Sequence, residues 1–423
     1  MPPLHLDRRA ALRSALVLLG ATGLAPLARA ADAAAPRGWA VPIGGGLKSS
    51  HDAVWERLVA LAGGRGARFV VFGTASESPL AAAEAAAEQL RRRGAQTSIL
   101  PVSPLLKERP IADAVRDPAF VESLRDARGV FFTGGSQDRI VDGFAPGGEM
   151  SPLLKAVWGV LDRGGVVAGT SAGAAIMSRT MFRDAPNVLG VMKGRFAEGK
   201  EWGAGLGFVG DRLFVDQHFL KRGRLGRMLP LMHARGYTLG LGVEEDAAAA
   251  VRGERIDILG GSAMLVDLSE ASSDARAGAF NLRGVRLSLL QGGDSYDMAR
   301  RELTPSEDKR RGQFIDPAAP GYKPYYTEQA FHVDMLGDGT IATAMGMLID
   351  ARYDEVRGLA FDPRPVPNDP LAPLGFEFRL YKTAGALGWY SETSAGEDYT
   401  VHRLGLDIAP VRLALPLYQP WSR

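Results

Sequence analysis

The chain has 423 residues, enough for one large domain or two, and its 46% hydrophobic and 23% charged residues are ordinary for a globular protein. It contains no cysteine, which excludes disulfides, thiolate nucleophiles and cysteine-bound metals. The formal net charge of +2 gives no case for a nucleic-acid partner. No stretch beyond the N-terminus is long and apolar enough to predict a membrane span.

Residues 1–30 have the pattern of a signal peptide. Arg8 and Arg9 precede an apolar stretch over residues 15–27, and residues 28–30 form an Ala-x-Ala-type cleavage site. The paired arginines resemble a twin-arginine export signal, with Sec export as the alternative. We therefore expect an exported protein that is periplasmic or secreted.

Strands and helices alternate from about residue 39 to residue 243. Strands are predicted over 39–43, 68–72, 97–102, 129–133 and 165–168, and helices over 54–61, 80–93 and 120–124. This alternation predicts an α/β fold with a doubly wound, mostly parallel sheet. Functional sites in such sheets form outside the carboxyl ends of the strands.

The pattern changes after residue 243. Short strands over 247–251, 255–259 and 263–266 predict an antiparallel edge. Residues 304–325 are rich in proline, glycine and charge and are interpreted as a linker. A helix over 340–350 and strands over 375–381 and 399–404 then predict a small C-terminal α+β appendage of unknown role. We therefore divide the chain into the signal peptide, an α/β domain over 31–303, and a linker with its appendage over 304–423.

The segment Gly169–Gly173 has the pattern Gly-x-Ser-x-Gly between a predicted buried strand and a predicted helix start. At such a turn this pattern is typical of a nucleophile elbow, which exposes Ser171 at the carboxyl end of the sheet. The N–H of Ala172 would point into the same space and could stabilise an oxyanion. The alternative is an ordinary helix N-cap, because serine is a good capping residue.

Two glycines end the strand that precedes the elbow strand. Gly134 and Gly135 allow the backbone to approach a ligand closely, and one of their N–H groups could complete an oxyanion hole. The alternative is an ordinary glycine turn.

A serine nucleophile needs a base, and a neutral imidazole suits this task at neutral pH. Of the six histidines, only His218 lies in a polar cluster directly after an apolar strand. A lone histidine is more often structural than catalytic. Three consecutive acids, Glu244, Glu245 and Asp246, end a later strand. One carboxylate could orient the histidine, and the alternative for this run is a charged turn.

Four cations follow His218 at or just before a predicted helix start, namely Lys221, Arg222, Arg224 and Arg227. Positive charge is unfavourable there because the helix macrodipole is positive at that end. The placement favours binding of anions such as substrate carboxylates by exposed guanidinium groups. The alternative is a solvated basic face. No spacing typical of metal ligands occurs, and we expect neither a metal nor a cofactor.

Together these motifs resemble the cyanophycinases, in the serine peptidase family that also includes the aspartyl dipeptidases. The resemblance covers roughly residues 38–300 and rests on segments 134–137, 169–174, 216–227, 242–246 and 291–297. It implies a class I glutamine amidotransferase-like fold, in which residues 31–303 form the catalytic peptidase domain. The sequence departs from the family pattern at Glu244, where aspartate is usual, and at Ala247, where threonine is usual.

The resemblance implies Ser171 as nucleophile, His218 as base and Glu245 as the acid that orients the base. It also implies substrate contacts by Gln137, Asp216, Gln217, Arg222, Arg224 and Arg227. The implied substrate is cyanophycin, a poly-aspartate with arginine linked to each side chain, and the implied products are β-aspartyl-arginine dipeptides. The alternatives are a related peptidase for other isoaspartyl or acidic peptides, and a non-catalytic binding protein. The oligomeric state stays open, with a homodimer among the expected states.

Overall fold

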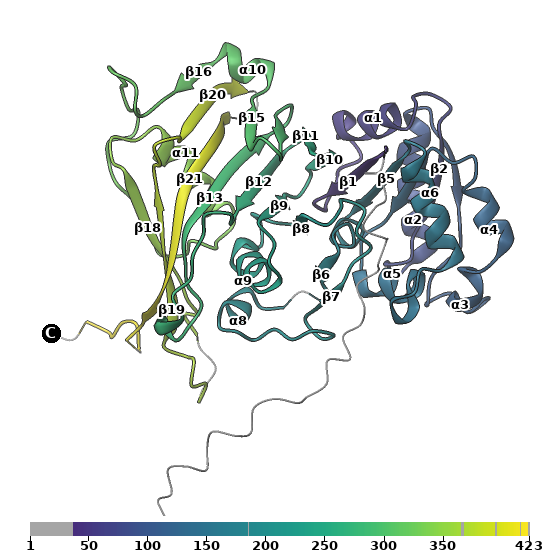
Figure 1. The fold of residues 1–423 in the computed structure, drawn as a ribbon, viewed down its shortest axis with the longest axis horizontal. Coiled ribbons are helices and arrows are strands. Elements are labelled where there is room, and N and C mark those ends of the chain that lie inside the picture. The colour runs from purple at the N-terminus through teal and green to yellow at the C-terminus, as the bar shows by residue number, and fades with distance from the viewer. Residues whose placement is uncertain (1–36, 185, 365–367, 394–395, 415, 422–423) are drawn as a thin grey trace, which may run out of the picture.

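The computed structural model describes residues 37–421 except 185, 365–367, 394–395 and 415. The predicted signal peptide therefore lies outside the described residues. Two large sheets form the framework of the molecule, with the N-terminal strands in one and the C-terminal strands in the other (Figure 1).

The first sheet has nine strands around a parallel core. The core strands, in spatial order, are β1 (Trp39–Ile43), β5 (Val166–Thr170), β4 (Gly129–Phe132), β2 (Arg68–Phe72) and β3 (Gln96–Ile99). The antiparallel strands that continue the sheet beyond β1 are β10 (Ala248–Arg252), β11 (Arg255–Gly260), β14 (Ser295–Asp297) and β15 (Glu302–Thr304). The predicted mixed α/β fold with a parallel core is confirmed.

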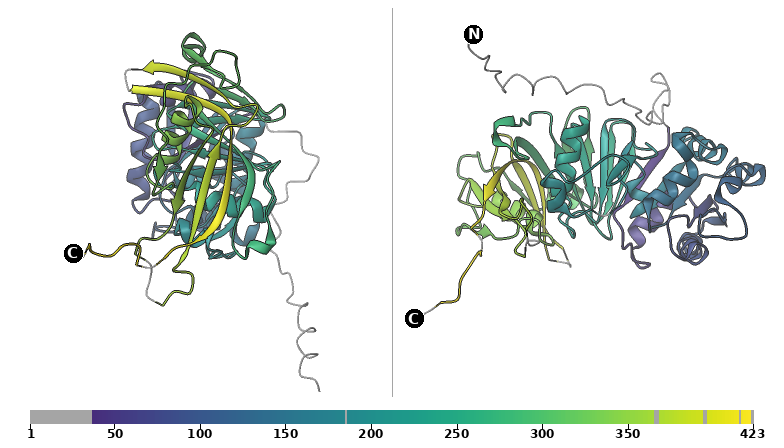
Figure 2. Two further views of the ribbon diagram at one scale, coloured as in Figure 1. Left: turned by 90° about the vertical axis from the view of Figure 1, so that its left-hand side faces the viewer. Right: turned by 90° about the horizontal axis from the view of Figure 1, so that it is seen from below.

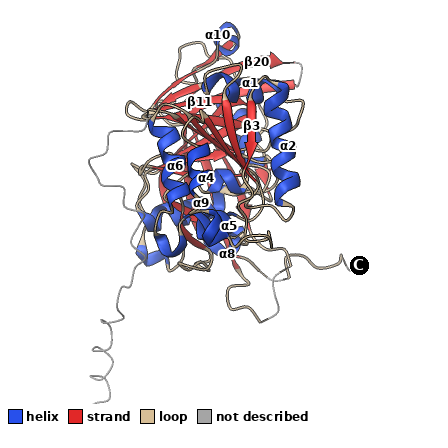
Figure 3. Ribbon diagram, turned by 90° about the vertical axis from the view of Figure 1, so that its right-hand side faces the viewer, coloured by secondary structure: helices blue, strands red, loops and turns tan. Residues whose placement is uncertain are grey.

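Helices cover both faces of this parallel core (Figure 3). Successive side chains of a strand point to opposite faces, so Val166 and Ala168 join one core cluster and Val167 joins the other. The first cluster includes residues of α1 (Asp52–Leu61) and α2 (Pro79–Arg92). The second includes residues of α3 (Ile111–Ala114), α5 (Gln137–Phe144) and α6 (Pro152–Asp162), and partly buried residues of α4 (Pro118–Ser123) pack against it. None of the described helices has the length and apolar character needed to cross a bilayer.

The second sheet has ten strands and is mostly antiparallel. Its main path is β17 (Phe331–His332), β18 (Glu355–Ala360), β19 (Leu374–Tyr381), β21 (Gly396–Arg412), β13 (Leu282–Gln291), β12 (Ser262–Asp267), β9 (Leu239–Val243) and β8 (Leu213–Gln217). The branch consists of β20 (Leu387–Thr393) and β16 (Gln313–Ile315). Residues of α9 (Leu225–Arg235) and α11 (Thr340–Ile349) share its core.

The sequence predicted that the strands before residue 243 all belong to one sheet, and this expectation is wrong for β8 and β9. Antiparallel β10 occupies the free edge of β1, so β8 and β9 cannot extend the parallel core there. They pair with each other, and β9 pairs with β12. Strand β12 was expected at the antiparallel edge of the first sheet, but it also lies in the second sheet.

The second sheet also crosses the boundary predicted at residue 303. Strand β21 pairs with β13, with Leu282 opposite Ile408 and Leu287 opposite Leu404. The segment interpreted as a linker contains β16 and α10 (Glu307–Arg311), whose Lys309 is buried beside Asp398. The boundary itself stays a prediction, but the C-terminal strands form no sheet of their own in the described chain (Figure 2).

Smaller elements connect the two sheets. After β5 come α7 (Ala172–Ala175), the strand pair β6 (Thr180–Phe182) and β7 (Trp202–Ala204), and α8 (Val188–Met192) between those strands. Two short 3-10 helices are η1 (Pro146–Gly148) and η2 (Ala275–Ala277).

Candidate active site

Ser171 lies in the sharp turn between β5 and α7, with a φ of 54° and a ψ of −107°. A side chain at Gly169 would come within 2.4 Å of the Gly173 carbonyl oxygen, and one at Gly173 within 2.5 Å of the Phe132 carbonyl oxygen. The turn therefore requires both flanking glycines, as a nucleophile elbow does. Ser171 precedes α7 but makes no side-chain capping hydrogen bond, which removes the N-cap alternative.

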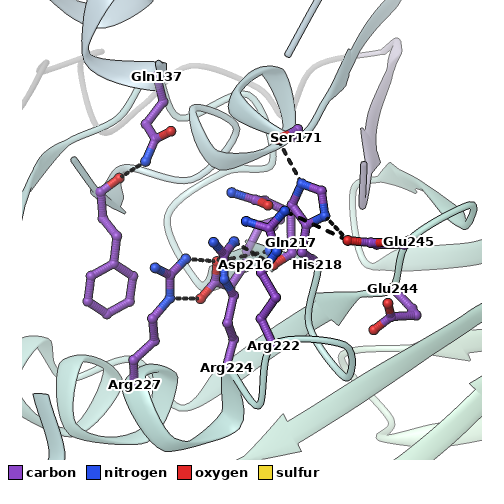
Figure 4. A network of polar contacts seen from close by, with 12 residues as sticks. Gln137, Ser171, Asp216, Gln217, His218, Arg222, Arg224, Arg227, Glu244 and Glu245 are labelled. Atoms are coloured by element: carbon purple, nitrogen blue, oxygen red, sulfur yellow. Dashed lines mark hydrogen bonds and ion pairs between the residues drawn. The ribbon is translucent and has the colours of Figure 1, made fainter. Parts of the chain in front are cut away.

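The hydroxyl of Ser171 instead faces an imidazole. The Ser171 Oγ lies 2.9 Å from Nε2 of His218, and Nδ1 of His218 lies 2.6 Å from Oε1 of Glu245 (Figure 4). The arrangement is that of a catalytic triad, in which the acid holds the imidazole so that Nε2 can accept the serine proton. The structure thus brings together the three residues that the sequence singled out, although their catalytic roles stay predictions.

The triad spans both sheets, since Ser171 follows β5 of the first and His218 and Glu245 follow β8 and β9 of the second. The segment Gly44–Gly46, directly after β1, connects them. The Gly44 carbonyl accepts the N–H of His218 at 2.7 Å, and the Gly45 carbonyl accepts the N–H of Asp246 at 2.8 Å. Gly45 has a φ of 114° and lies so close to the His218 ring that a Cβ would come within 2.2 Å of it.

Sequence reasoning missed this role of Gly44–Gly46. The available signal was a run of three glycines at the end of a predicted strand. Glycine is needed there because no other residue lets backbone lie directly against an imidazole at such a φ.

Burial lowers the pKa of His218 below its ordinary value. The hydrogen bond to Glu245 opposes this shift, and the positive charges of Arg222 and Arg224 add to it. The imidazole is therefore neutral at neutral pH, which is the form that can take a proton from Ser171.

The three consecutive acids have three different partners. Glu245 bonds His218, whereas a carboxylate oxygen of Glu244 accepts the backbone N–H groups of Leu220 and Lys221. Asp246 lies 3.0 Å from Nδ1 of His51, and it also accepts the backbone N–H of Lys48. Only Glu245 is placed to orient the base.

The backbone near Ser171 offers N–H groups for an oxyanion. Gly134 lies beside the nucleophile, since its Cβ would be 3.2 Å from Cβ of Ser171. Gly135 has a φ of 140° and fits closely against the Ala75 carbonyl. Within the described residues, no protein acceptor bonds the N–H of Gly134, Gly135 or Ala172. These groups are therefore available to a developing negative charge.

The expectation that the arginines lie exposed is wrong for two of them. Arg224 and Arg227 are only 4% and 1% exposed. Arg227 donates through Nε and Nη2 to the two carboxylate oxygens of Asp216, at 2.7 and 2.6 Å, and its guanidinium lies over the ring of Phe182. Burial requires this pairing, because an isolated charge is costly away from water. Arg227 and Asp216 are therefore committed chiefly to each other.

Arg224 is less completely paired. Its Nη1 donates to the Gln217 carbonyl at 2.7 Å and lies 3.6 Å from a carboxylate oxygen of Asp216. Burial lowers its pKa to about 10, so it remains a cation at neutral pH. The side-chain oxygen of Gln217 is buried and has no protein partner among the described residues.

The remaining predicted contact residues lie on either side of this network. Arg222 is the exposed member of the arginine run, with about half of its side chain accessible and Nη2 3.8 Å from Glu245. Gln137 begins α5 and donates through Nε2 to the Phe182 carbonyl at 2.8 Å. Figure 4 shows all six predicted contact residues around the triad.

The C-terminal part of the chain supports the loop that carries these arginines. Gly223 approaches the Leu336 carbonyl so closely that a Cβ would lie 2.1 Å from it. The N–H of Gly339 donates to the Leu220 carbonyl at 3.3 Å, and Lys221 pairs with Asp338. No pattern in the sequence predicted that residues 336–339 would border the site.

No cluster of histidine, aspartate or glutamate suited to hold a metal ion occurs within the part of the chain that the structure describes. The site geometry is that of a serine hydrolase. The sequence pattern of peptidase family S51 matches residues 43–259, and the chain belongs to this family of serine peptidases.

Among curated relatives, a cyanophycinase from Trichormus variabilis is 32% identical over 198 residues, which are 44% of this chain and 61% of that protein. A cyanophycinase from Geminocystis herdmanii is 28% identical over 272 residues, which are 60% of this chain and 92% of that protein. The chain thus spans about three fifths of the first of these relatives. A solved peptidase structure from an acI-B1 actinobacterium has a TM-score of 0.42 at 17% identity and covers 64% of this chain and 95% of its own.

Proposed function

We propose that this protein is a serine exopeptidase that hydrolyses cyanophycin to β-aspartyl-arginine dipeptides. The observation that carries the proposal is the hydrogen-bonded chain from Ser171 through His218 to Glu245, with distances of 2.9 and 2.6 Å. Membership of a serine peptidase family and relatives named cyanophycinase support it.

In the proposed mechanism, His218 takes the proton of Ser171 as the hydroxyl attacks the scissile carbonyl carbon. The N–H groups of Gly134, Gly135 and Ala172 are the candidate donors to the oxyanion. His218 then gives the proton to the leaving amine, which breaks the C–N bond and leaves an acyl-enzyme. Attack of water, again with His218 as base, releases the acid product and restores Ser171. Glu245 stabilises the imidazolium in both steps.

The proposed substrate carries a carboxylate and a guanidinium on every repeat. Arg222 offers an exposed cation beside the triad, and Arg224 is a buried cation that Asp216 neutralises only partly. Both can meet substrate carboxylates through charge-assisted hydrogen bonds. The N-terminal pattern of residues 1–30 supports an exported enzyme, which suits an insoluble polymer met outside the cell.

The test is to incubate the purified protein with insoluble cyanophycin and to analyse the released dipeptides. Ser171→Ala should abolish release, with a loss of roughly 10⁶ in turnover by precedent from another serine peptidase, while the Tm stays close to that of the wild type. Retention of more than a few per cent of activity would contradict the serine mechanism. Release of products from other isoaspartyl peptides, but not from cyanophycin, would favour the related-peptidase alternative.

A further inference from the structure

A cavity of about 340 Å³ lies at the carboxyl ends of the parallel strands of the first sheet. Three of its lining residues mark these ends, since Gly46 lies in the turn after β1, Thr133 follows β4 and Thr170 is the last residue of β5. The other walls include Trp55 of α1 and residues of α2. The volume is in the range of pockets that hold small ligands or single side chains.

The cavity adjoins the candidate active site at the same end of the sheet. Thr170 immediately precedes Ser171, so their Cα atoms are about 3.8 Å apart. Thr133 immediately precedes Gly134, and a Cβ on Gly134 would lie 3.2 Å from Cβ of Ser171. The cavity therefore begins next to the candidate nucleophile and next to a candidate oxyanion donor.

The cavity and the predicted substrate contacts lie on opposite faces of the first sheet. Phe131 belongs to the core cluster of α1 and α2, and Thr133, two residues later, points to the same face and also lines the cavity. Gln137 begins α5, which packs in the cluster on the other face. On that side the Gln137 amide bonds the Phe182 carbonyl, and the Arg227 guanidinium lies over the Phe182 ring. A substrate bound across the end of β5 can therefore reach both regions.

The lining of the cavity suits an uncharged polar group. The hydroxyl of Thr133 is buried, with the residue only 4% exposed, and it has no hydrogen-bond partner among the described residues. A buried hydroxyl without a partner is costly, and a ligand that bonds it would remove this cost. None of the residues that line the cavity carries a charge. A carboxylate would lose water there without meeting a cation, whereas an amide can both donate to a hydroxyl and accept from it.

We propose that this cavity binds the side chain of the residue on the leaving-amine side of the cleaved bond, and that it selects an amide over a free carboxylate. The inference rests on the proposed function, because it requires acyl transfer at Ser171 with the acyl part held on the side of Arg222 and Arg224. In the proposed polymer every aspartate side chain is joined to arginine through an amide, so the leaving residue presents this uncharged group. Thr133 is then a specificity-determining residue.

The test uses two soluble β-aspartyl-arginine oligomers, extended at the carboxyl end by either asparagine or aspartate. The two terminal residues have nearly the same shape, and cleavage before them leaves the same acyl-enzyme. A difference in kcat/KM, measured as release of the free amino acid, therefore arises on the leaving side. The wild type should favour the asparagine oligomer by roughly tenfold.

Two variants change the cavity in different ways. Thr133→Val removes the hydroxyl at nearly constant volume, and Ala82→Leu fills the space from α2. Both should lower kcat/KM on the asparagine oligomer by roughly three- to tenfold and leave the aspartate oligomer unchanged. The Tm of Thr133→Val should equal or exceed that of the wild type, because a buried hydroxyl without a partner is gone. Ala81→Leu is the matched control, since Ala81 is the exposed neighbour on α2 that does not line the cavity.

The outcomes separate the inference from the proposed function. If the wild type releases products from neither the polymer nor the oligomers, the proposed function fails and the inference with it. If the wild type hydrolyses the polymer but does not favour the asparagine oligomer, or if both cavity variants match it, the inference alone fails. An equal loss on both oligomers would also overturn it, because the effect would then lie at the triad or on the acyl side.

Discussion

Gly45→Ala is expected to disable the triad although it replaces none of the three triad residues. The new Cβ would lie 2.2, 2.4 and 2.8 Å from Cε1, Nε2 and Nδ1 of His218. The ring must retreat by about 1.2 Å, the difference between 2.2 Å and an ordinary contact of 3.4 Å. It is held at 2.9 Å from Ser171 and 2.6 Å from Glu245, so this movement breaks at least one hydrogen bond. A misplacement of this size costs roughly 10²-fold in rate.

The assay is kcat/KM on a soluble β-aspartyl-arginine oligomer, together with the rate at which a fluorophosphonate labels Ser171. Both should fall by roughly two orders of magnitude. Gly46→Ala is the matched control, since Gly46 also has a positive φ, of 59°, but its Cβ would come no closer than 3.7 Å to any neighbour. That variant bears backbone strain of about 1–2 kcal/mol without the clash. Equal kinetics for the Gly45 and Gly46 variants would refute the reasoning.

Three further predictions concern the charged residues of the site. Glu245→Gln should lower turnover by about 10⁴-fold by protease precedent, whereas Glu244→Gln should act mildly, and the reverse ranking of kcat would assign the acid to Glu244. Arg222→Ala should raise the apparent pKa at which kcat/KM falls on the acid side of the pH profile, because the charge of Arg222 disfavours protonation of His218. A downward shift of that pKa, or no shift, would contradict this. Arg227→Ala should lower the free energy of unfolding by about 3–5 kcal/mol, since it removes both short hydrogen bonds to the buried Asp216 and leaves it, as an ion pair, only the longer contact with Arg224 at 3.6 Å. An unchanged urea midpoint would show that the Arg227–Asp216 pair is not structural.

Local patterns in the sequence were enough to predict the parallel core and the nucleophile elbow. A short run of apolar residues predicts a buried strand. Where such runs alternate with amphipathic helices, they predict β-α-β connections independently of the rest of the chain. The Gly-x-Ser-x-Gly pattern of the elbow is also read locally, and Gly169 is required by Gly173 within the same turn, although Gly173 is required by the Phe132 carbonyl of the neighbouring strand β4. His218 and Glu245 could be proposed as partners of Ser171 from their residue types and from the resemblance to the peptidase family.

Only the tertiary structure decided how these pieces meet. Glu244 and Glu245 are neighbours with the same side chain, so the sequence alone does not tell which of them bonds His218. The path of the backbone after β9 turns Glu245 toward His218 and Glu244 toward the backbone of Lys221. Arg224 and Arg227 lie in a sequence typical of an exposed basic run, yet both are buried. Their burial depends on Asp216, which precedes Arg224 by eight residues and Arg227 by eleven and lies next to both guanidinium groups. Strand pairing and burial depend on surfaces far apart in the chain, and no local pattern encodes which of those surfaces come into contact.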